Sequence, residues 1–156
     1  LRGAKAALGD VPASIVSCAG ATVMAALDTA CPSMDSLKEK RELVVGLGML
    51  GLLAVEAALR AGAAVTATDP NSHRRRYAAQ LGACISGFSD FDPALDIVEN
   101  FDVALEFSGS PQGVITCLKP LDINGVAVLA GSVADSPAID LPRMDCPRLA
   151  HCYRRV

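Results

Sequence analysis

The chain has 156 residues, of which 51% are hydrophobic and 20% charged, and 14 basic against 17 acidic side chains give a formal net charge of −3. This balance indicates one folded globular domain and excludes disorder, collagen and coiled coil. It also argues against nucleic-acid binding, which draws on a clustered basic face, and no apolar run reaches the ~20 residues of a membrane helix. We therefore expect a cytoplasmic domain with neither nucleic acid nor membrane as a partner.

The six cysteines are spread along the chain without any C-x-x-C pair. We interpret them as reduced thiols of a cytosolic protein. Cys146 and Cys152 are a weak alternative as metal ligands, because no second pair or histidine stands at zinc-finger spacing. Residues 15–18 resemble a lipoprotein cleavage site, but Asp10 and Pro12 interrupt the apolar region that such a signal requires. The chain starts without a methionine, which suggests a fragment of something longer.

Residues 1–36 are predicted to form a leading helix and a linker. The stretch after Ser14 is small and apolar, and Ser14 is a suitable N-cap, so we expect a helix over residues 14–29. Pro32 and its polar neighbours then indicate a linker up to residue 36.

Residues 37–135 alternate between short apolar strands and helices. The predicted strands are residues 42–45, 64–68, 83–85, 102–107 and 126–130. The predicted helices run from near Met49 to Arg60, from an N-cap at Ser72 through Gln80, over residues 93–99, and from after Pro111 to Leu118. Gly62 and Gly82 each end a helix, and Asn124-Gly125 is predicted to form a turn.

This alternation predicts an α/β fold, a doubly wound parallel sheet of the Rossmann type in three α/β/α layers. In such a fold the ligand crevice lies at the carboxyl ends of the strands. The predicted core is residues 37–135, and residues 136–156 form a tail of uncertain structure with a candidate edge strand at 149–153.

A glycine motif, G-x-G-x-x-G, lies between the first predicted strand and the following helix. Gly46 would permit the tight turn, Gly48 would let the backbone approach a pyrophosphate, and Gly51 would let the helix pack on the strand. The helix that starts near Met49 would point its free N–H groups at the phosphates. A glycine-rich turn without a ligand is the alternative interpretation.

An acidic residue, Asp69, ends the next strand about 20 residues beyond the glycines, where a carboxylate can accept hydrogen bonds from both adenosine-ribose hydroxyls. This favours NAD over NADP, whose 2′-phosphate would face a negative charge. The basic run from His73 to Arg76 complicates the choice, because arginines there suit a 2′-phosphate. We interpret the run as solvated helix-face charges with Arg74 alone near the ribose.

Several motifs in order along the chain resemble the zinc-dependent alcohol dehydrogenases of the medium-chain dehydrogenase/reductase superfamily. They are Cys18-Ala19-Gly20-Ala21-Thr22, Val44-Val45-Gly46-Leu47-Gly48-Met49-Leu50-Gly51, Thr68-Asp69, Gln80-Leu81-Gly82-Ala83 and Glu106-Phe107-Ser108-Gly109-Ser110. The resemblance runs from about residue 11 to about residue 135. Within the superfamily it is similar to the dehydrogenases found with phosphonate catabolism and, less closely, to sorbitol and threonine dehydrogenases.

The resemblance implies roles for particular residues. Cys18 stands where the family places the third protein ligand of the catalytic zinc, and Thr22 where a threonine approaches the nicotinamide. The remaining cofactor contacts implied are the glycine turn with Met49 and Leu50, the adenosine-ribose residues Asp69 and Arg74, the loop Ser108-Gly109, and Ala130-Gly131-Ser132 at the nicotinamide carboxamide. Zinc would lower the pKa of the substrate alcohol, and hydride would pass to the nicotinamide.

The family's catalytic, GroES-like domain, which supplies the other zinc ligands and most of the substrate pocket, is absent from this sequence. Its two histidines, His73 and His151, do not stand in a setting typical of a metal ligand. We therefore expect the chain alone to bind cofactor without zinc and without activity on alcohols. The family also commonly pairs through the strand after Gly131, which predicts a homodimer joined at the sheet edge.

Three other interpretations stay open. A stand-alone dinucleotide-binding module with a regulatory role would need no positioned acid, base or nucleophile. The zinc-free quinone reductases are a further alternative, but they generally favour NADPH and lack a cysteine at the place of Cys18. A methyltransferase is disfavoured, because its glycine loop usually follows an acidic residue in the first strand, where Val44 and Val45 stand.

Overall fold

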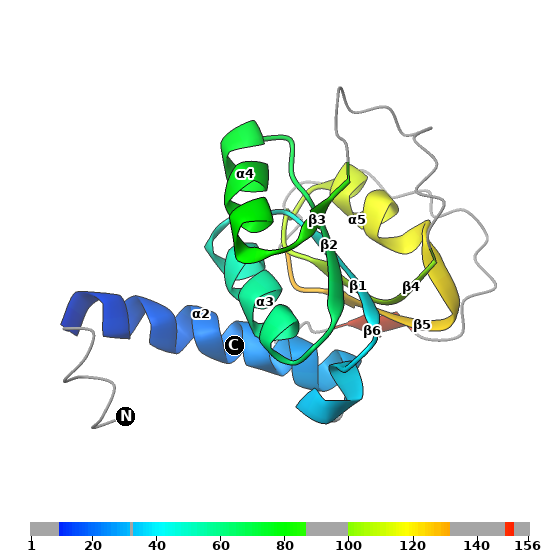
Figure 1. Cartoon of the computed structure of the whole chain (residues 1–156), viewed down its shortest axis with the longest axis horizontal. Helices are drawn as coiled ribbons and strands as arrows, with labels where there is room; N and C mark the ends of the chain where they lie inside the picture. The colour runs from blue at the N-terminus through cyan, green and yellow to red at the C-terminus, as the bar shows by residue number, and fades with distance from the viewer. Residues whose placement is uncertain (1–9, 32, 87–99, 132–148, 152–156) are drawn as a thin grey trace.

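The computed structural model describes residues 10–31, 33–86, 100–131 and 149–151 (Figure 1). Its elements, in chain order, are α2 (Asp10–Ala30), η1 (Met34–Leu37), β1 (Arg41–Val45), α3 (Met49–Arg60), β2 (Ala64–Thr68), α4 (Ser72–Leu81), β3 (Cys84–Ile85), β4 (Phe101–Glu106), α5 (Pro111–Leu118), β5 (Leu121–Leu129) and β6 (Leu149–His151). The strands form one sheet in the order β3-β2-β1-β4-β5-β6, and every pair is parallel. This is the Rossmann strand order, so the predicted doubly wound fold is confirmed.

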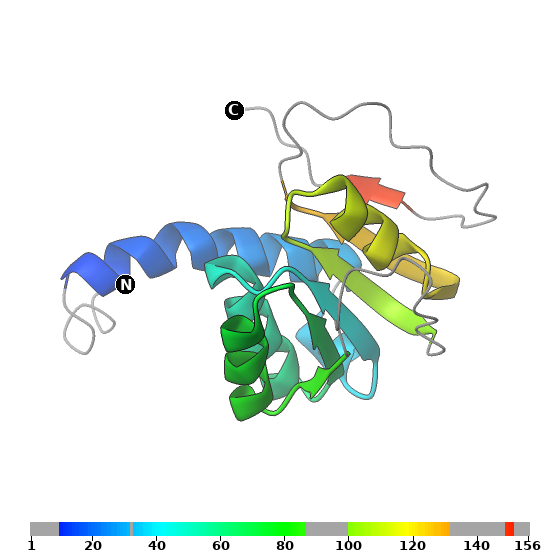
Figure 2. The ribbon, with the colours of Figure 1, turned by 90° about the horizontal axis from the view of Figure 1, so that it is seen from above.

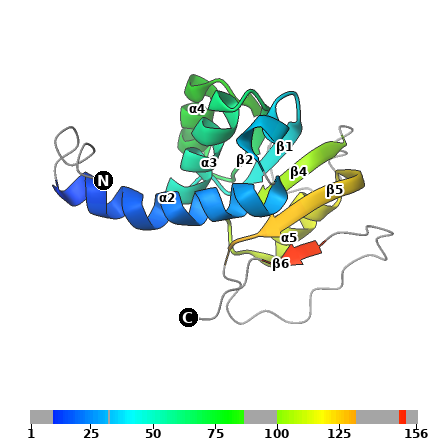
Figure 3. The same cartoon turned by 90° about the horizontal axis from the view of Figure 1, so that it is seen from below.

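Helices cover both faces of the sheet (Figures 2 and 3). Among the described elements, α2, α3 and α4 pack on one face and α5 on the other. The side chains of β1 alternate between these two cores: Val44 belongs to the first, and Leu43 and Val45 belong to the second. A strand buried on both sides explains why Leu43, Val44 and Val45 are all apolar rather than alternating with polar residues.

The long helix α2 is part of the core and also extends beyond it. Val23 and Leu27 are buried against the α3 face of the sheet, whereas the N-terminal part of α2 projects past the sheet (Figure 1). The helix begins at Asp10, so the predicted N-cap at Ser14 is wrong. Pro12 lies in the first turn, where a missing N–H costs nothing, and it therefore does not delay the start of the helix.

Two other local predictions need correction. Asn71, not Ser72, caps α4, because its side chain accepts hydrogen bonds from the N–H groups of His73 and Arg74. Asn124 and Gly125 do not separate two elements but lie inside β5, where the register with β4 shifts. Asn124 takes a left-handed conformation there, with φ 72°, as expected of an irregularity within a strand. The helix predicted over residues 93–99 lies outside the described residues.

A charged cluster closes the amino-terminal edge of the sheet. Asp102, near the start of β4, accepts hydrogen bonds from the backbone N–H of Arg41 at 2.9 Å and from its guanidinium at 3.4 Å. The same guanidinium bonds Asp122 at 2.9 Å. This cluster lies at the end of the strands opposite the glycine turn.

Candidate functional site

The glycine turn after β1 has the geometry that its sequence predicts. Gly46 has φ +90°, and a Cβ there would lie 2.6 Å from the backbone nitrogen of Ser108. A Cβ on Gly51 would lie 1.9 Å from the carbonyl oxygen of Gly46. Both positions are therefore restricted to glycine by close backbone approach. Around Gly48, in contrast, nothing lies within 4 Å of a built Cβ.

The open space beside Gly48 faces the start of α3. Gly48 is the N-cap of this helix and supplies no side-chain hydrogen bond to it. The first N–H groups of a helix have no partner within the helix and carry the positive end of its dipole. Met49 is exposed and Leu50 half-buried in this first turn. The turn therefore presents backbone donors toward a space that an anionic group can enter.

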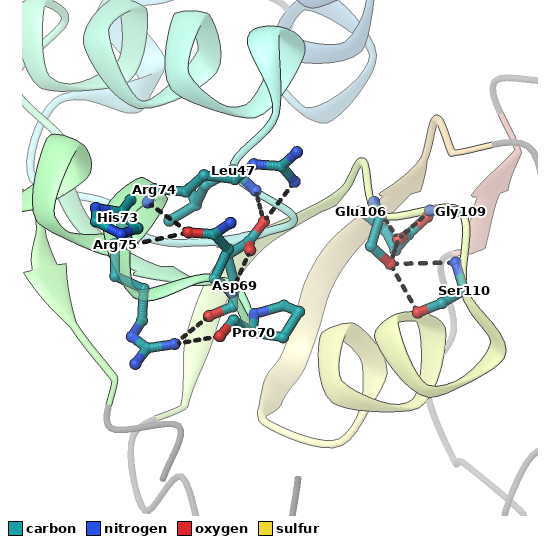
Figure 4. Close-up of polar contacts among 11 residues, drawn as sticks. Leu47, Asp69, Pro70, His73, Arg74, Arg75, Glu106, Gly109 and Ser110 are labelled. Carbon is teal, nitrogen blue, oxygen red and sulfur yellow. Dashed lines mark hydrogen bonds and ion pairs between the residues drawn. The ribbon is translucent and has the colours of Figure 1, made fainter. Parts of the chain in front are cut away.

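The carboxylate of Asp69 links this turn to the end of β2 (Figure 4). One oxygen accepts a 2.7 Å hydrogen bond from the N–H of Leu47, and the other accepts a 2.7 Å bond from the N–H of Asn71. The guanidinium of Arg74 lies 3.5 Å from the first oxygen. With three donors on two oxygens, Asp69 keeps about one free acceptor position. It is 3% exposed.

One residue of the basic run, Arg75, is less exposed than the sequence suggests. Arg74 pairs with Asp69, with 3.5 Å between the guanidinium and the carboxylate. Arg75, however, donates to the carbonyl oxygens of Asp69 and Pro70 at 2.6 and 2.9 Å and so holds the chain as it leaves β2. The interpretation of Arg75 as a solvated charge is therefore wrong, whereas Arg76 is exposed.

A pocket of about 230 Å³ opens between the carboxyl ends of β1, β2 and β4. It is lined by Val45, Gly46, Gly48, Thr68, Asp69, Pro70, Arg74, Phe107, Ser108, Ser110, Gly113 and Thr116. The hydroxyl of Thr68 is buried and has no hydrogen-bond partner within the described structure. A buried polar group of this kind ordinarily finds a partner, so the unused hydroxyl and the open face of Gly48 both fit a polar ligand in this pocket.

The loop after β4 forms the opposite wall. Ser110 caps α5 by accepting a hydrogen bond from the N–H of Gly113 at 2.9 Å, and its hydroxyl lies 3.0 Å from that of Ser108. Gly109 lies directly beside Gly131, because a Cβ on Gly131 would be 2.4 Å from the Gly109 nitrogen. Ala130 and Gly131 follow β5, so the fold brings two of the predicted cofactor segments together.

The structure does not bring every predicted residue to the pocket. Thr22 is exposed on α2, where its hydroxyl donates to the carbonyl of Cys18, and it does not line the pocket. The predicted cofactor residues Met49, Leu50, Gly51, Gly109, Ala130 and Gly131 are likewise not among the lining residues. Cys18 is exposed one turn earlier. Ser132, Cys146 and Cys152 lie outside the described residues.

The described residues by themselves do not form a zinc site. They contain no group of three or more His, Cys, Asp or Glu side chains that could hold a metal, and we assign no step to zinc. In the same part of the chain, no helix has both the length and the apolar content needed to cross a membrane.

Other pocket residues escaped the sequence reasoning. The lining residues outside the predicted set of cofactor contacts are Val45, Thr68, Pro70, Phe107, Ser110, Gly113 and Thr116. Val45, Thr68 and Phe107 are the last residues of predicted strands, and Pro70 follows one of these strands by two residues, so their position at strand ends was the available signal. Gly113 and Thr116 line the pocket from α5. The position of α5 depends on how the β4–α5–β5 connection packs on the sheet and not on a local sequence motif.

The fold is a Rossmann-type α/β domain with a pocket at the carboxyl ends of its strands. The sequence profile of the family described as "Zinc-binding dehydrogenase" matches residues 50–153. The chain belongs to this family.

Relatives and solved structures agree with that assignment. The L-threonine 3-dehydrogenase of Legionella pneumophila (strain Corby) is 32% identical over 105 residues, covering 63% of this chain and 31% of that protein. L-Idonate 5-dehydrogenase from Escherichia coli is 26% identical with a TM-score of 0.75, covering 95% of this chain and 43% of that one. 2R,3R-Butanediol dehydrogenase from Bacillus subtilis is 27% identical with a TM-score of 0.60, over 71% and 33% of the two chains. This chain thus spans about a third of the threonine dehydrogenase it matches.

Proposed function

We propose that this chain is the NAD(H)-binding domain of a zinc-dependent alcohol or polyol dehydrogenase. The observation that carries the proposal is the open face of Gly48, which lies in one pocket with Asp69 and Ser108. Gly48 and the first turn of α3 would hold the pyrophosphate, Asp69 the adenosine ribose, and the Ser108 loop the opposite side of the cofactor. The cofactor, when bound, accepts or donates the hydride.

The contacts of the two arginines support NAD over NADP. Arg74 is paired with Asp69, and Arg75 donates to two backbone carbonyls. The 2′-phosphate of NADP would therefore be repelled by the buried Asp69 carboxylate, and these two guanidinium groups already have other partners. A zinc-binding dehydrogenase from Sinorhizobium meliloti 1021 has this fold with a TM-score of 0.67 at 20% identity, and that structure is bound to NADP. NADPH is therefore the second ligand to test.

We propose that a longer protein containing this domain oxidises or reduces an alcohol or polyol by hydride transfer. The relatives named above are dehydrogenases of L-threonine, L-idonate and 2R,3R-butanediol, which supports hydride transfer from a hydroxyl-bearing substrate. Cys18 is this chain's proposed contribution to the zinc, and Thr22 its proposed contact near the nicotinamide. Pairing through the sheet edge, where β6 lies, is the proposed route to a homodimer.

Calorimetric titration of the 156-residue chain with NADH and NADPH tests the cofactor proposal. We expect NADH to bind more tightly than NADPH. Asp69→Ala should weaken the binding of NADH and so reduce the ratio of the NADPH Kd to the NADH Kd. The matched control is Asp102→Ala, which removes a carboxylate that also binds a backbone N–H but at the opposite edge of the sheet. The control should leave both affinities unchanged. Absence of binding for both dinucleotides at millimolar concentration would overturn the proposal.

A further inference from the structure

A buried glutamate, Glu106, lies at the carboxyl end of β4 (Figure 4), directly before the pocket-lining residues Phe107 and Ser108. Its Oε1 accepts hydrogen bonds from the N–H of Ser108 at 2.6 Å, from the N–H of Gly109 at 3.0 Å, and from the Ser108 hydroxyl. Its backbone carbonyl accepts from the N–H groups of Ala130 and Gly131, both at 2.9 Å. Glu106 thus binds the Ser108–Gly109 loop, of which Ser108 lines the pocket, and also Ala130–Gly131, which follow β5 and are not among the lining residues.

Three glycines pack closely around the carboxylate. A Cβ on Gly131 would lie 2.4 Å from Oε2, and a Cβ on Gly113 would lie 3.0 Å from Oε1. Gly109 adjoins Gly131 in turn. The absence of these side chains lets two loops and the first turn of α5 approach one carboxyl group, so its position determines how these three segments lie.

This arrangement has a cost for folding. The second oxygen, Oε2, is buried and has no hydrogen-bond partner within the described structure. Burying a carboxylate with one oxygen unsatisfied is unfavourable, and an apolar side chain of similar size would avoid that penalty. Such a group in a folded protein calls for an explanation beyond stability.

We propose that Glu106 is a positioning residue for the cofactor, holding Ser108–Gly109 against Ala130–Gly131 so that the half of the dinucleotide beyond the pyrophosphate is bound in one place. This inference rests on the proposed function. Asp69 holds the turn after β1 in the same way, by accepting its backbone N–H. The two carboxylates would therefore organise opposite ends of the ligand, Asp69 the adenosine end and Glu106 the nicotinamide end.

The test compares NADH with AMP, which lacks the nicotinamide half, as ligands of the wild-type chain and of Glu106→Gln. Glutamine keeps the size and one acceptor oxygen but loses the charge and places a donor at the position of Oε2. We expect the Kd for NADH to rise about tenfold, as for the loss of a charge-assisted hydrogen bond, while the Kd for AMP changes less than about threefold. A general loss of folded protein would instead weaken both ligands equally.

The control is Glu42→Gln, which alters another buried glutamate, on β1, away from the pocket lining. It should leave both affinities unchanged. If Glu106→Gln does not fold, Glu106→Asp keeps the charge but shortens the side chain by one methylene, which withdraws the carboxylate from the two loops, and it should raise the ratio of the NADH Kd to the AMP Kd in the same direction. An unchanged ratio in a folded Glu106 variant would overturn the inference. Failure of the wild-type chain to bind NADH would instead overturn the proposed function.

Discussion

The N–H of Leu47 donates a 2.7 Å hydrogen bond to the carboxylate of Asp69, 22 residues later in the chain. This bond joins the turn after β1 to the end of β2 inside the folded domain. The carboxylate that the sequence assigns to a ribose therefore also holds the glycine turn in shape. Asp69→Ala should for this reason lower both NADH affinity and stability, and the Asp102→Ala control separates the two effects.

Gly46 and Gly48 are expected to respond differently to alanine. Gly46→Ala places a Cβ at positive φ within 2.6 Å of the Ser108 nitrogen, and should lower the free energy of unfolding by about 2–4 kcal/mol. Gly48→Ala meets open space and should cost less than about 1 kcal/mol, yet weaken NADH binding. Thermal unfolding and calorimetry of both variants test this contrast. Equal destabilisation by the two substitutions would contradict it.

Glu42 should make stability depend on pH. Burial raises its pKa from 4.5 to about 8, and neither carboxylate oxygen has a hydrogen-bond partner among the described residues. The folded chain thus binds this proton more tightly than the unfolded chain. Its stabilising effect is complete below about pH 4.5 and is lost as the pH rises toward 8, a change of about 3–5 kcal/mol at most.

Urea unfolding of the wild type and Glu42→Gln at pH 5, 7 and 9 measures this effect. We expect the wild type to lose stability relative to Glu42→Gln as the pH rises, because glutamine does not titrate. Glu56→Gln is the control, since Glu56 is half-buried on α3 and paired with Arg60. A difference between the wild type and Glu42→Gln that stays constant from pH 5 to 9 would contradict the prediction.

Arg75 and Arg76 should differ although they are neighbours in one basic run. Arg75→Ala removes two hydrogen bonds to the carbonyls of Asp69 and Pro70, and should lower the free energy of unfolding by about 1–2 kcal/mol. Arg76→Ala alters an exposed side chain and should change stability by less than about 0.5 kcal/mol. Chemical denaturation of the two variants gives the comparison. Similar losses of unfolding free energy for the two variants would show that the hydrogen bonds of Arg75 do not stabilise the fold.

The described cysteines should divide into two classes by reactivity. Cys18 and Cys84 are exposed, whereas Cys31 and Cys117 are buried. Burial raises the pKa of the Cys31 and Cys117 thiols, and the thiolate is the nucleophile. Under native conditions, iodoacetamide should therefore label Cys18 and Cys84 at least about tenfold faster. Peptide mass spectrometry measures the rates, and labelling in guanidinium should abolish the difference. Native labelling of Cys117 as fast as Cys18 would contradict the burial assigned to it.

Local patterns were enough to predict the fold class and much of the glycine turn. Short apolar runs, helix-ending glycines and the G-x-G-x-x-G spacing depend on backbone geometry within a few residues, and each strand predicted over the described residues has a counterpart in the sheet. The element boundaries were less predictable. Asn71 and Asn124 show that caps and bulges depend on which local conformations and hydrogen bonds the neighbouring structure permits.

Contacts across the sheet depended on the tertiary structure. Nothing near Glu106 in the sequence indicates that Ala130 and Gly131 bond to its carbonyl, or that Arg75 caps the end of β2. The contacts between Glu106 and Ala130–Gly131 join residues that are far apart in the sequence, where no local pattern signals the contact. Their geometry follows from the order of the strands and the packing of the connections between them. The roles of Cys18 and Thr22 stay predictions. Sequence thus defined which residues could bind a dinucleotide, whereas folding decided which of them share a pocket, because only parallel pairing brings the carboxyl ends of separate strands to one edge.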